Sequence, residues 1–236
     1  MIADAARNNA EWCDAMCRAH GISGVFGERA WTSEFRTPPL YPDAVTLSPR
    51  AAAQDVLDGI DRAAPGCSVK DSFGRLDLSS DGFEVIIEAR WIHRPATLVT
   101  PVAPAGVVWR PVRTAGGLGQ WAAAWAGEDG DMAGIFRPEL LTHRATTVLA
   151  GTTEAAEGGR RTIAGAVVSR SASVLGISNL FAVDDDLDRA WAGCLAAVAR
   201  LWPGMPVVGW EAGESLDAAM GQGCLPGQEL RVWLAG

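Results

Sequence analysis

The order of strand and helix patterns in the last third of the chain, residues 162–234, constrains its fold more than any other feature. Apolar periodicity and β-branched content divide this stretch into strand, strand, helix, strand, short helix and strand. The six segments are Thr162–Arg170, Ser173–Val183, Leu187–Leu201, Pro206–Glu211, Ser215–Gln222 and Leu230–Leu234. Strands and helices that interleave in this way predict an α/β fold with a mixed sheet.

Composition restricts the class of protein. Of 236 residues, 48% are hydrophobic and 20% are charged, which is typical of a chain that buries a core. No apolar run reaches the roughly 18–20 residues that span a bilayer, and the first residues lack the features of a signal peptide. We therefore expect a cytoplasmic protein with no membrane partner.

Charge and cysteine content narrow the class further. The net charge is −8, and because phosphate binding needs a basic patch, nucleic acid is not expected as a partner. The five cysteines are an odd number without framework spacing, which favours free thiols in a reducing compartment. The sequence leaves open whether the protein is a monomer or a homodimer.

The first 105 residues predict a subdomain of helices and strands. A pattern with helical spacing covers Asn8–His20. Ser48 and Pro49 are typical of an N-cap and a first helical residue, and the helix that they begin is expected to run to about Ala63. Two strands are expected after this helix, Cys67–Lys70 and Phe83–Ile92.

Pro95–Gly106 is the best candidate for a linker, because it holds three prolines and no charged residue. We therefore expect one domain over residues 1–105 and a second over 106–236. IDRAAPGCSVKDSFGRLDLSSDGFEVIIEARWI can be aligned with VARLWPGMPVVGWEAGESLDAAMGQGCLPGQELRVWL. Either the first domain contains a degenerate half copy of the second, or the pattern of a helix, a Pro-Gly turn and a strand occurs twice by chance.

Residues 106–236 resemble the GCN5-related N-acetyltransferase (GNAT) superfamily in the order of their elements and in their local sequence patterns. The segments that carry the resemblance are WRPVRTAGGLGQWAAAW, IAGAVVSRSASVLGISNLFAV, DRAWAGCLAAVARLWPG, MPVVGWE and ESLDAAMGQGCLPGQELRVWL. The resemblance implies an enzyme that moves an acetyl or related acyl group from acyl-CoA to a small-molecule amine by direct attack. It also implies that CoA lies between Ser173–Val183 and Pro206–Trp210, where splayed strands leave backbone groups for the pantetheine amides.

The resemblance further implies that the pyrophosphate of CoA lies at the start of the following helix, within Val183–Gly193. Family members usually carry Gln/Arg-x-x-Gly-x-Gly/Ala there, whereas this chain has Asp184–Asp186 and no glycine before the helix. Aspartates cap helices well but repel phosphate. The cofactor-binding candidates that the resemblance implies are Asn179, Leu180, Phe181, Ala182, Val183, Arg189, Ala192 and Gly193.

The departure at Asp184–Asp186 supports an alternative function. A GNAT-fold protein that has lost CoA-dependent transfer could bind a small molecule or catalyse another reaction in the same cleft. The family's usual acid, a tyrosine in the last helix, is also missing, since the only tyrosine of the chain is Tyr41.

Three residues are candidates for acid–base catalysis. Glu211 ends a strand at the expected split and would act as general base directly or through a water, or else is a surface carboxylate. Glu88 shares a strand face with Glu84, and the two either bind a cationic group or lie on an exposed face. His93, at the end of that strand, would act as a base near neutral pH.

Aromatic residues favour an amine as substrate. Trp31, Tyr41 and Trp210 are candidates for the wall of a pocket, with Glu84 facing the positive charge.

Cysteine chemistry is a third hypothesis, with Cys13 or Cys224 as nucleophile, although Cys224 is more simply a small core residue. Cys13-x3-Cys17-x2-His20 lacks a fourth ligand, so no metal is expected.

Overall fold

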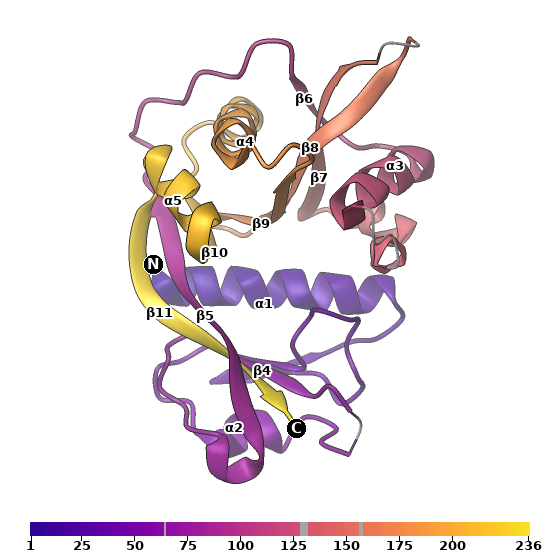
Figure 1. The fold of residues 1–236 in the computed structure, drawn as a ribbon. Coiled ribbons are helices and arrows are strands. Elements are labelled where there is room, and N and C mark those ends of the chain that lie inside the picture. The colour runs from indigo at the N-terminus through magenta and orange to yellow at the C-terminus, as the bar shows by residue number, and fades with distance from the viewer. Residues whose placement is uncertain (64, 128–131, 156–157) are drawn as a thin grey trace. The chain divides into compact units, whose positions relative to one another are not determined.

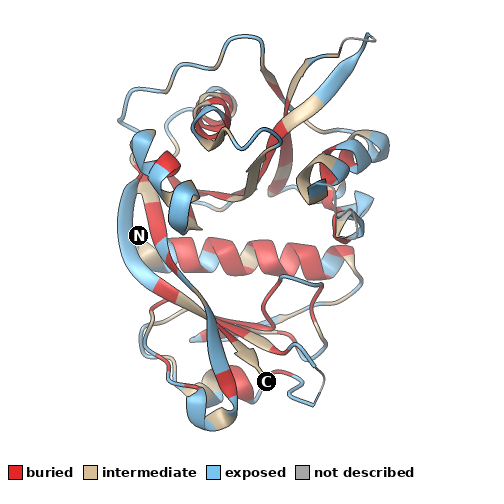
Figure 2. Cartoon of the chain, viewed as in Figure 1, coloured by how far each residue is buried: buried red, intermediate tan, exposed pale blue. Residues whose placement is uncertain are grey.

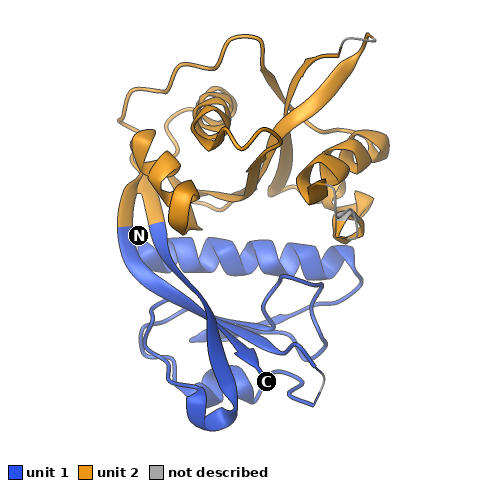
Figure 3. Ribbon diagram, viewed as in Figure 1, with its two compact units in different colours: residues 1–91, 227–236 blue, residues 92–226 orange. Residues whose placement is uncertain are grey.

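The computed structural model describes residues 1–63, 65–127, 132–155 and 158–236 and divides the chain into two compact units (Figures 1 and 3). Unit 1 comprises Met1–Trp91 and Gly227–Gly236, and unit 2 comprises Ile92–Pro226. Two long strands, β5 (Phe83–Arg94) and β11 (Leu225–Ala235), have residues in both units. This division assigns residues 92–105 to the second unit and the last ten residues to the first, whereas the boundary after residue 105 stays a prediction.

The described residues of unit 1 form four short strands, parts of the long strands β5 and β11, two α-helices and one turn of 3-10 helix. Its strands follow the order β1-β2-β3-β4-β11-β5, in which β3 and β4 are parallel and β1–β2, β2–β3 and β4–β11 are antiparallel. The elements other than β5 and β11 are α1 (Ile2–Ala19), β1 (Val25–Phe26), β2 (Ala30–Thr32), β3 (Ala44–Thr46), α2 (Ala53–Leu57), β4 (Ser68–Asp71) and η1 (Ser79–Asp81).

The helix predicted from Ser48 to Ala63 is shorter in the structure, where α2 covers only Ala53–Leu57. The hydroxyl oxygen of Ser48 accepts a hydrogen bond from the amide of Arg50 at 3.2 Å, and this bond folds a turn in place of a helical start. The helix begins after Ala52, whose amide donates to the Asp55 carboxylate at 2.8 Å. The prediction was wrong because a serine followed by proline is equally suited to a turn.

Unit 2 contains the second group of strands. Its strands follow the order β5-β10-β9-β8-β7-β6, in which β9 and β10 are parallel and β6–β7, β7–β8 and β8–β9 are antiparallel. The elements are β6 (Val108–Pro111), α3 (Ala115–Ala126), η3 (Ala133–Ile135), η4 (Pro138–Thr142), β7 (Thr146–Glu154), β8 (Arg160–Arg170), β9 (Leu175–Ala182), α4 (Leu187–Leu201), β10 (Val207–Glu211) and α5 (Gly213–Gly221).

Tryptophans packed on glycines fix the helices of unit 2 against its sheet. The indole of Trp109 lies where a side chain at Gly193 of α4 or at Gly151 of β7 would project, so only glycine fits at either position. Trp121 of α3 lies against Gly165 of β8 in the same way, and its indole donates to the carbonyl of Leu149 at 2.9 Å. These contacts hold α3 and α4 close to the strands, and α4 is buried along its inner face (Figure 2).

The mixed α/β fold predicted from the sequence is confirmed. The helix predicted over Leu187–Leu201 is found with the same bounds, and strands predicted in the last third end within a few residues of their expected limits. Across the described ranges, no helix combines the length and apolar character needed to cross a bilayer.

Candidate functional site

The parallel strands β9 and β10 separate after two residue pairs. Leu175 pairs with Val207, and Gly176 pairs with Val208. Beyond these, the remainder of β10 and of β9 form no ladder with each other in the described part of the chain. The side chains of β9 are buried up to Ile177 and only half-buried over its last five residues. The two strands therefore part before their carboxyl ends, and we refer to this separation as the opening. The carboxyl ends of neighbouring parallel strands are a common place for ligands in α/β sheets.

Gly209 marks the point where the strands diverge. A Cβ atom at this position would lie 3.0 Å from the carbonyl oxygen of Ile177 and 3.5 Å from Ile92. Glycine thus permits the last close approach of β10 to β9 before the strands part. The sequence pattern VVGWE carried this signal, but it was interpreted only as an apolar strand.

A β-bulge in β9 lies beside the opening. Val167 of β8 pairs with Ser178, and Gly165 pairs with Phe181, so two steps along β8 match three along β9. Asn179 within the bulge has φ of 53°, a left-handed conformation that asparagine tolerates better than most residues. The sequence left open whether Asn179 lines a cavity or marks a bulge, and the structure shows a bulge with a half-buried side chain. A bulge bends its strand and removes backbone groups from the ladder.

Three of the predicted residues gather on the strands next to this opening. Trp210 and Glu211 are half-buried at the end of β10, past its last pair with β9. His93 is half-buried on β5, the strand next to β10. Burial lowers the pKa of His93, so its imidazole is largely neutral at pH 7 and can accept a proton. The structure thus keeps Glu211 and His93 as candidate bases in unit 2.

Cys224 is unsuited to nucleophilic catalysis. Its thiol is buried, and burial raises its pKa to about 12, with Glu211 adding to the rise and Arg94 opposing it. Arg94, which the sequence analysis missed, is 9% exposed and donates to the carbonyls of Gln222 at 2.9 Å and Val99 at 2.6 Å. The guanidinium therefore ties the end of α5 to the segment after β5. Cys13 is also buried with a pKa raised to about 12, mainly by burial.

The start of α4 satisfies its own backbone amides. Asp186 is the N-cap, and its carboxylate accepts from the amide of Arg189 at 3.1 Å. The amide of Leu187 donates to the carbonyl of Asp185 at 2.9 Å. The Arg189 side chain forms an ion pair with Asp186 at 3.7 Å and donates to the carbonyl of Ala105 at 3.4 Å. Donors that would hold a phosphate are thus largely engaged by the chain itself.

The space beside this helix start is small. A pocket of about 20 Å³ lies between β6, β8, the end of β9 and α4, with Ala182, Asp184, Asp186 and Arg189 in its lining. This volume suits about one water-sized group. The residues fit the amide-bearing arm of CoA along β9, but they do not fit its diphosphate at α4.

Several residues implied as cofactor ligands make contacts within the chain. Gly193 lies under the indole of Trp109. Phe181 packs edge-on against Trp121, with ring centroids 5.3 Å apart. The amide of Val183 donates to the carbonyl of Ile163 at 2.8 Å. These contacts place Gly193 and Phe181 in the packing of unit 2, and their role in binding a cofactor stays a prediction.

The remaining cofactor candidates divide between core and surface. Leu180 is half-buried and packs against the core of unit 2, while Ala192 is half-buried on α4. Ala182 and Arg189 are in the lining of the small pocket and remain candidates only for contacts at that point.

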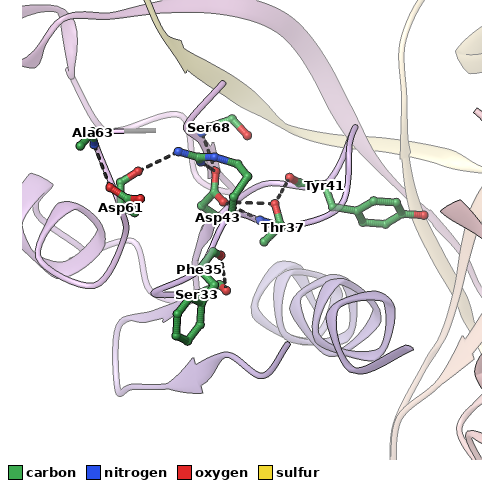
Figure 4. A network of polar contacts seen from close by, with 9 residues as sticks. Ser33, Phe35, Thr37, Tyr41, Asp43, Asp61, Ala63 and Ser68 are labelled. Carbon is green, nitrogen blue, oxygen red and sulfur yellow. Dashed lines mark hydrogen bonds and ion pairs between the residues drawn. The ribbon is translucent and has the colours of Figure 1, made fainter. Parts of the chain in front are cut away.

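Four predicted residues belong to unit 1. Trp31 is fully buried and donates from its indole to the Asp14 carboxylate at 3.2 Å, so it forms core and not a pocket wall. Tyr41 is also buried, with its ring edge-on to Trp12, and it extends away from the Asp43 network (Figure 4). Glu88 is exposed and forms an ion pair with Arg231 at 3.2 Å.

Glu84, which shares the exposed stretch of β5, is itself exposed. The structure therefore favours the exposed-face interpretation of Glu84 and Glu88. Asp43 forms the most extensive buried polar network of this region, accepting hydrogen bonds from the side chain of Arg36, the amide and hydroxyl of Thr37 and the amide of Ser68 (Figure 4). No group of His, Cys, Asp and Glu side chains suited to a metal ion occurs among the residues that the structure places.

Comparison with known proteins identifies the fold. No protein-family model and no curated protein matches the chain. A GCN5-related N-acetyltransferase from Kribbella flavida is similar over 98% of this chain and 95% of its own, with TM-score 0.60 and 15% identity. The chain has a GNAT-like fold.

Two further structures share this GNAT-like fold. A protein from Novosphingobium aromaticivorans, assigned to the GNAT family, is similar over 94% of each chain, with TM-score 0.53 and 14% identity. A conserved protein of unknown function from Staphylococcus epidermidis is similar over 73% of each chain, with TM-score 0.60 and 10% identity. These similarities concern the fold, and the opening between β9 and β10 is the candidate site of this chain.

Proposed function

We propose that this protein is an acyltransferase that moves an acetyl or related acyl group from a thioester donor to a small-molecule amine. The observation that carries the proposal is the separation of β9 and β10 after Gly176 and Val208, next to the bulge at Asn179. Backbone amides and carbonyls that leave a ladder need partners, and an extended donor with amide groups supplies them. Acyl-CoA is the donor expected from the fold.

Glu211 is the proposed general base. The amine nitrogen attacks the thioester carbonyl, the C–N bond forms and the C–S bond breaks. A proton from the nitrogen passes to Glu211 directly or through one water, and the sulfur leaves as thiolate or, once protonated by solvent, as thiol. His93 is the second candidate for the proton, since burial keeps its imidazole neutral at pH 7. Trp210, half-buried beside Glu211 in the chain, is proposed to contact the amine.

An acyl-transfer assay tests this proposal. Purified protein is incubated with acetyl-CoA, or with S-acetyl-pantetheine, and a panel of small amines, and acetylated amines are detected by mass spectrometry. We expect transfer to at least one amine, and Glu211→Gln to lower kcat by about 10²-fold or more. Glu88→Gln is the matched control, because Glu88 is an exposed carboxylate in unit 1. Absence of transfer from both donors to every amine contradicts the proposal.

A second function is favoured by the start of α4. Because Asp186 caps the helix and Asp184 lies in the lining of the adjacent pocket, the fold is also suited to binding a small molecule without CoA-dependent transfer. Thermal stability in the presence of amines and metabolites, without any thioester, tests this alternative. A ligand that raises Tm in wild type and in Glu211→Gln alike, with no transfer detected, supports a binding module.

We further propose, from the fold and composition, that the protein acts as a monomer or homodimer in the cytoplasm, with no nucleic-acid or membrane partner. Size-exclusion chromatography with light scattering measures the oligomeric state.

A further inference from the structure

The acyl donor is constrained by two features of unit 2 that point in opposite directions. The edge of β9 next to the opening is suited to a chain of amide groups, since its ladder with β10 ends at Gly176 in the described part of the chain. The start of α4 is unsuited to phosphate, since the amides of Leu187 and Arg189 and the Arg189 side chain already have partners. A donor that satisfies both features carries amides but no diphosphate.

Charge strengthens this constraint. Asp184, Asp185, Asp186 and Asp188 fall within five residues, and Arg189 is the only cation in that stretch. Because Arg189 is paired with Asp186, the net field at the helix start is negative. A diphosphate that bound here would lose part of its hydration and would be repelled by the neighbouring carboxylates.

Space gives the same result. The pocket at the helix start has a volume of about 20 Å³, which suits about one water-sized group. The opening along β9 does not share this limit, because its residues from Ser178 onward are only half-buried.

We propose that the acyl donor of this protein is an uncharged, amide-bearing thioester of the S-acyl-pantetheine type, bound along the edge of β9 that faces the opening, without contacts to a nucleotide diphosphate. This inference rests on the proposed function and specifies its donor class. Acetyl-CoA can still bind through its pantetheine arm, but its nucleotide end gains no affinity from α4.

Calorimetric titration with two probes, S-acetyl-pantetheine and acetyl-CoA, tests the inference. We expect acetyl-CoA to bind no more tightly than S-acetyl-pantetheine. We also expect acetyl-CoA binding to strengthen between about 20 mM and about 300 mM salt, because salt screens repulsion from the aspartates. A site that recognises the diphosphate gives the reverse salt dependence, with affinity falling as salt rises.

A pair of variants locates the effect. Asp184→Asn/Asp185→Asn removes two carboxylates while keeping the Asp186 cap, and asparagine tolerates the left-handed φ of 57° at position 185. We expect about fivefold tighter binding of acetyl-CoA and no change for S-acetyl-pantetheine. Glu139→Gln/Glu154→Gln is the matched control, since it removes the same charge from exposed positions of unit 2.

The outcomes are distinguishable. Acetyl-CoA binding at least tenfold tighter than S-acetyl-pantetheine, and weakened by salt, overturns the donor class but leaves the transferase intact. No binding of either probe at millimolar concentration overturns both the donor class and the proposed function. Equal binding of the two probes, with the expected response of the aspartate variant, supports both.

Discussion

The β3–β4 pair of unit 1 and the β9–β10 pair of unit 2 are both parallel, each joins its strands through a helix, and each has two paired positions. They differ at the next position along the strands. In unit 1 the hydroxyl of Thr46 donates to the Asp71 carboxylate at 3.3 Å and accepts from the amide of Ser72 at 2.8 Å. In unit 2 the corresponding residues are Ile177 and Gly209, which have no polar side chain.

This difference explains why only one pair provides a candidate site. Buried polar side chains can hold two strands together after their backbone ladder has ended. Where those side chains are absent, the strands diverge and their edges remain available to a ligand. The β3–β4 pair, called here the closed pair, is then an internal reference for the β9–β10 pair, called the open pair. Four predictions test the comparison.

The largest expected effect is the loss of the bridge in unit 1. Asp71 is 1% exposed, and besides Thr46 it accepts from the amides of Phe73 at 3.1 Å and Leu76 at 2.7 Å. Asp71→Ala leaves buried donors without a partner and is expected to cost about 3 kcal/mol of unfolding free energy, measured by urea denaturation.

Asp77→Ala is the matched control for Asp71→Ala. Asp77 also accepts from an amide and a hydroxyl, those of Ser79, but it is exposed, so a much smaller loss is expected. Equal losses in the two variants would show that burial of the Asp71 bridge is not what keeps β3 and β4 together.

The second effect concerns the packing of the helix that joins the open pair. A methyl group at Gly193 collides with the indole of Trp109, so Gly193→Ala is expected to destabilise the protein by about 2 kcal/mol. Gly119→Ala is the control, because Gly119 lies in α3 with no atom within 4 Å of an added Cβ. That change is expected to stabilise by about 0.5–1 kcal/mol through helix propensity, and the two Tm values should move in opposite directions.

Local sequence patterns predicted the secondary structure around the open pair better than they predicted which residues line a site. The periodicity of Leu187–Leu201 predicted α4 with the bounds that the structure shows, because its apolar face packs on the sheet. Tryptophans were less predictable. Trp31 was interpreted as a pocket wall, but it fills the core over Gly24, a contact between residues of different elements that no local pattern encodes.

The opening itself depends on strand pairing, which the sequence does not show directly. Its position between Ser173–Val183 and Pro206–Trp210 followed only from the resemblance, while Gly209 and Arg94 were missed. The sequence alone shows the carboxylates of Asp184–Asp186 before α4. Only the structure shows that Asp186 caps the helix and that Arg189 is engaged by it.

The third effect is a difference in backbone protection. We expect amides in the last five residues of β9 that do not bond to β8 to exchange with solvent at least about tenfold faster than those of Val69 and Lys70 in β4. Hydrogen exchange measured by NMR resolves the two groups. Adding S-acetyl-pantetheine is expected to slow exchange in β9 and to leave β4 unchanged, and equal protection of both pairs without ligand would remove the basis of the comparison.

The smallest effect tests whether burial of His93 on β5, the strand next to β10, disfavours the charged form of its imidazole. Burial lowers the pKa of His93 below its ordinary value of 6.5. As pH falls, the unfolded chain therefore takes up the proton first, so His93 lowers stability progressively from about pH 6.5 down through its folded pKa. Urea unfolding at pH 7.5 and pH 5.5 should show a smaller acid loss for His93→Gln than for wild type. The difference is expected to be small, because the half-buried ring is partly solvated. An equal acid loss in the variant would mean that folding does not shift the pKa of His93, and a larger loss would mean that the imidazole is stabilised in its charged form.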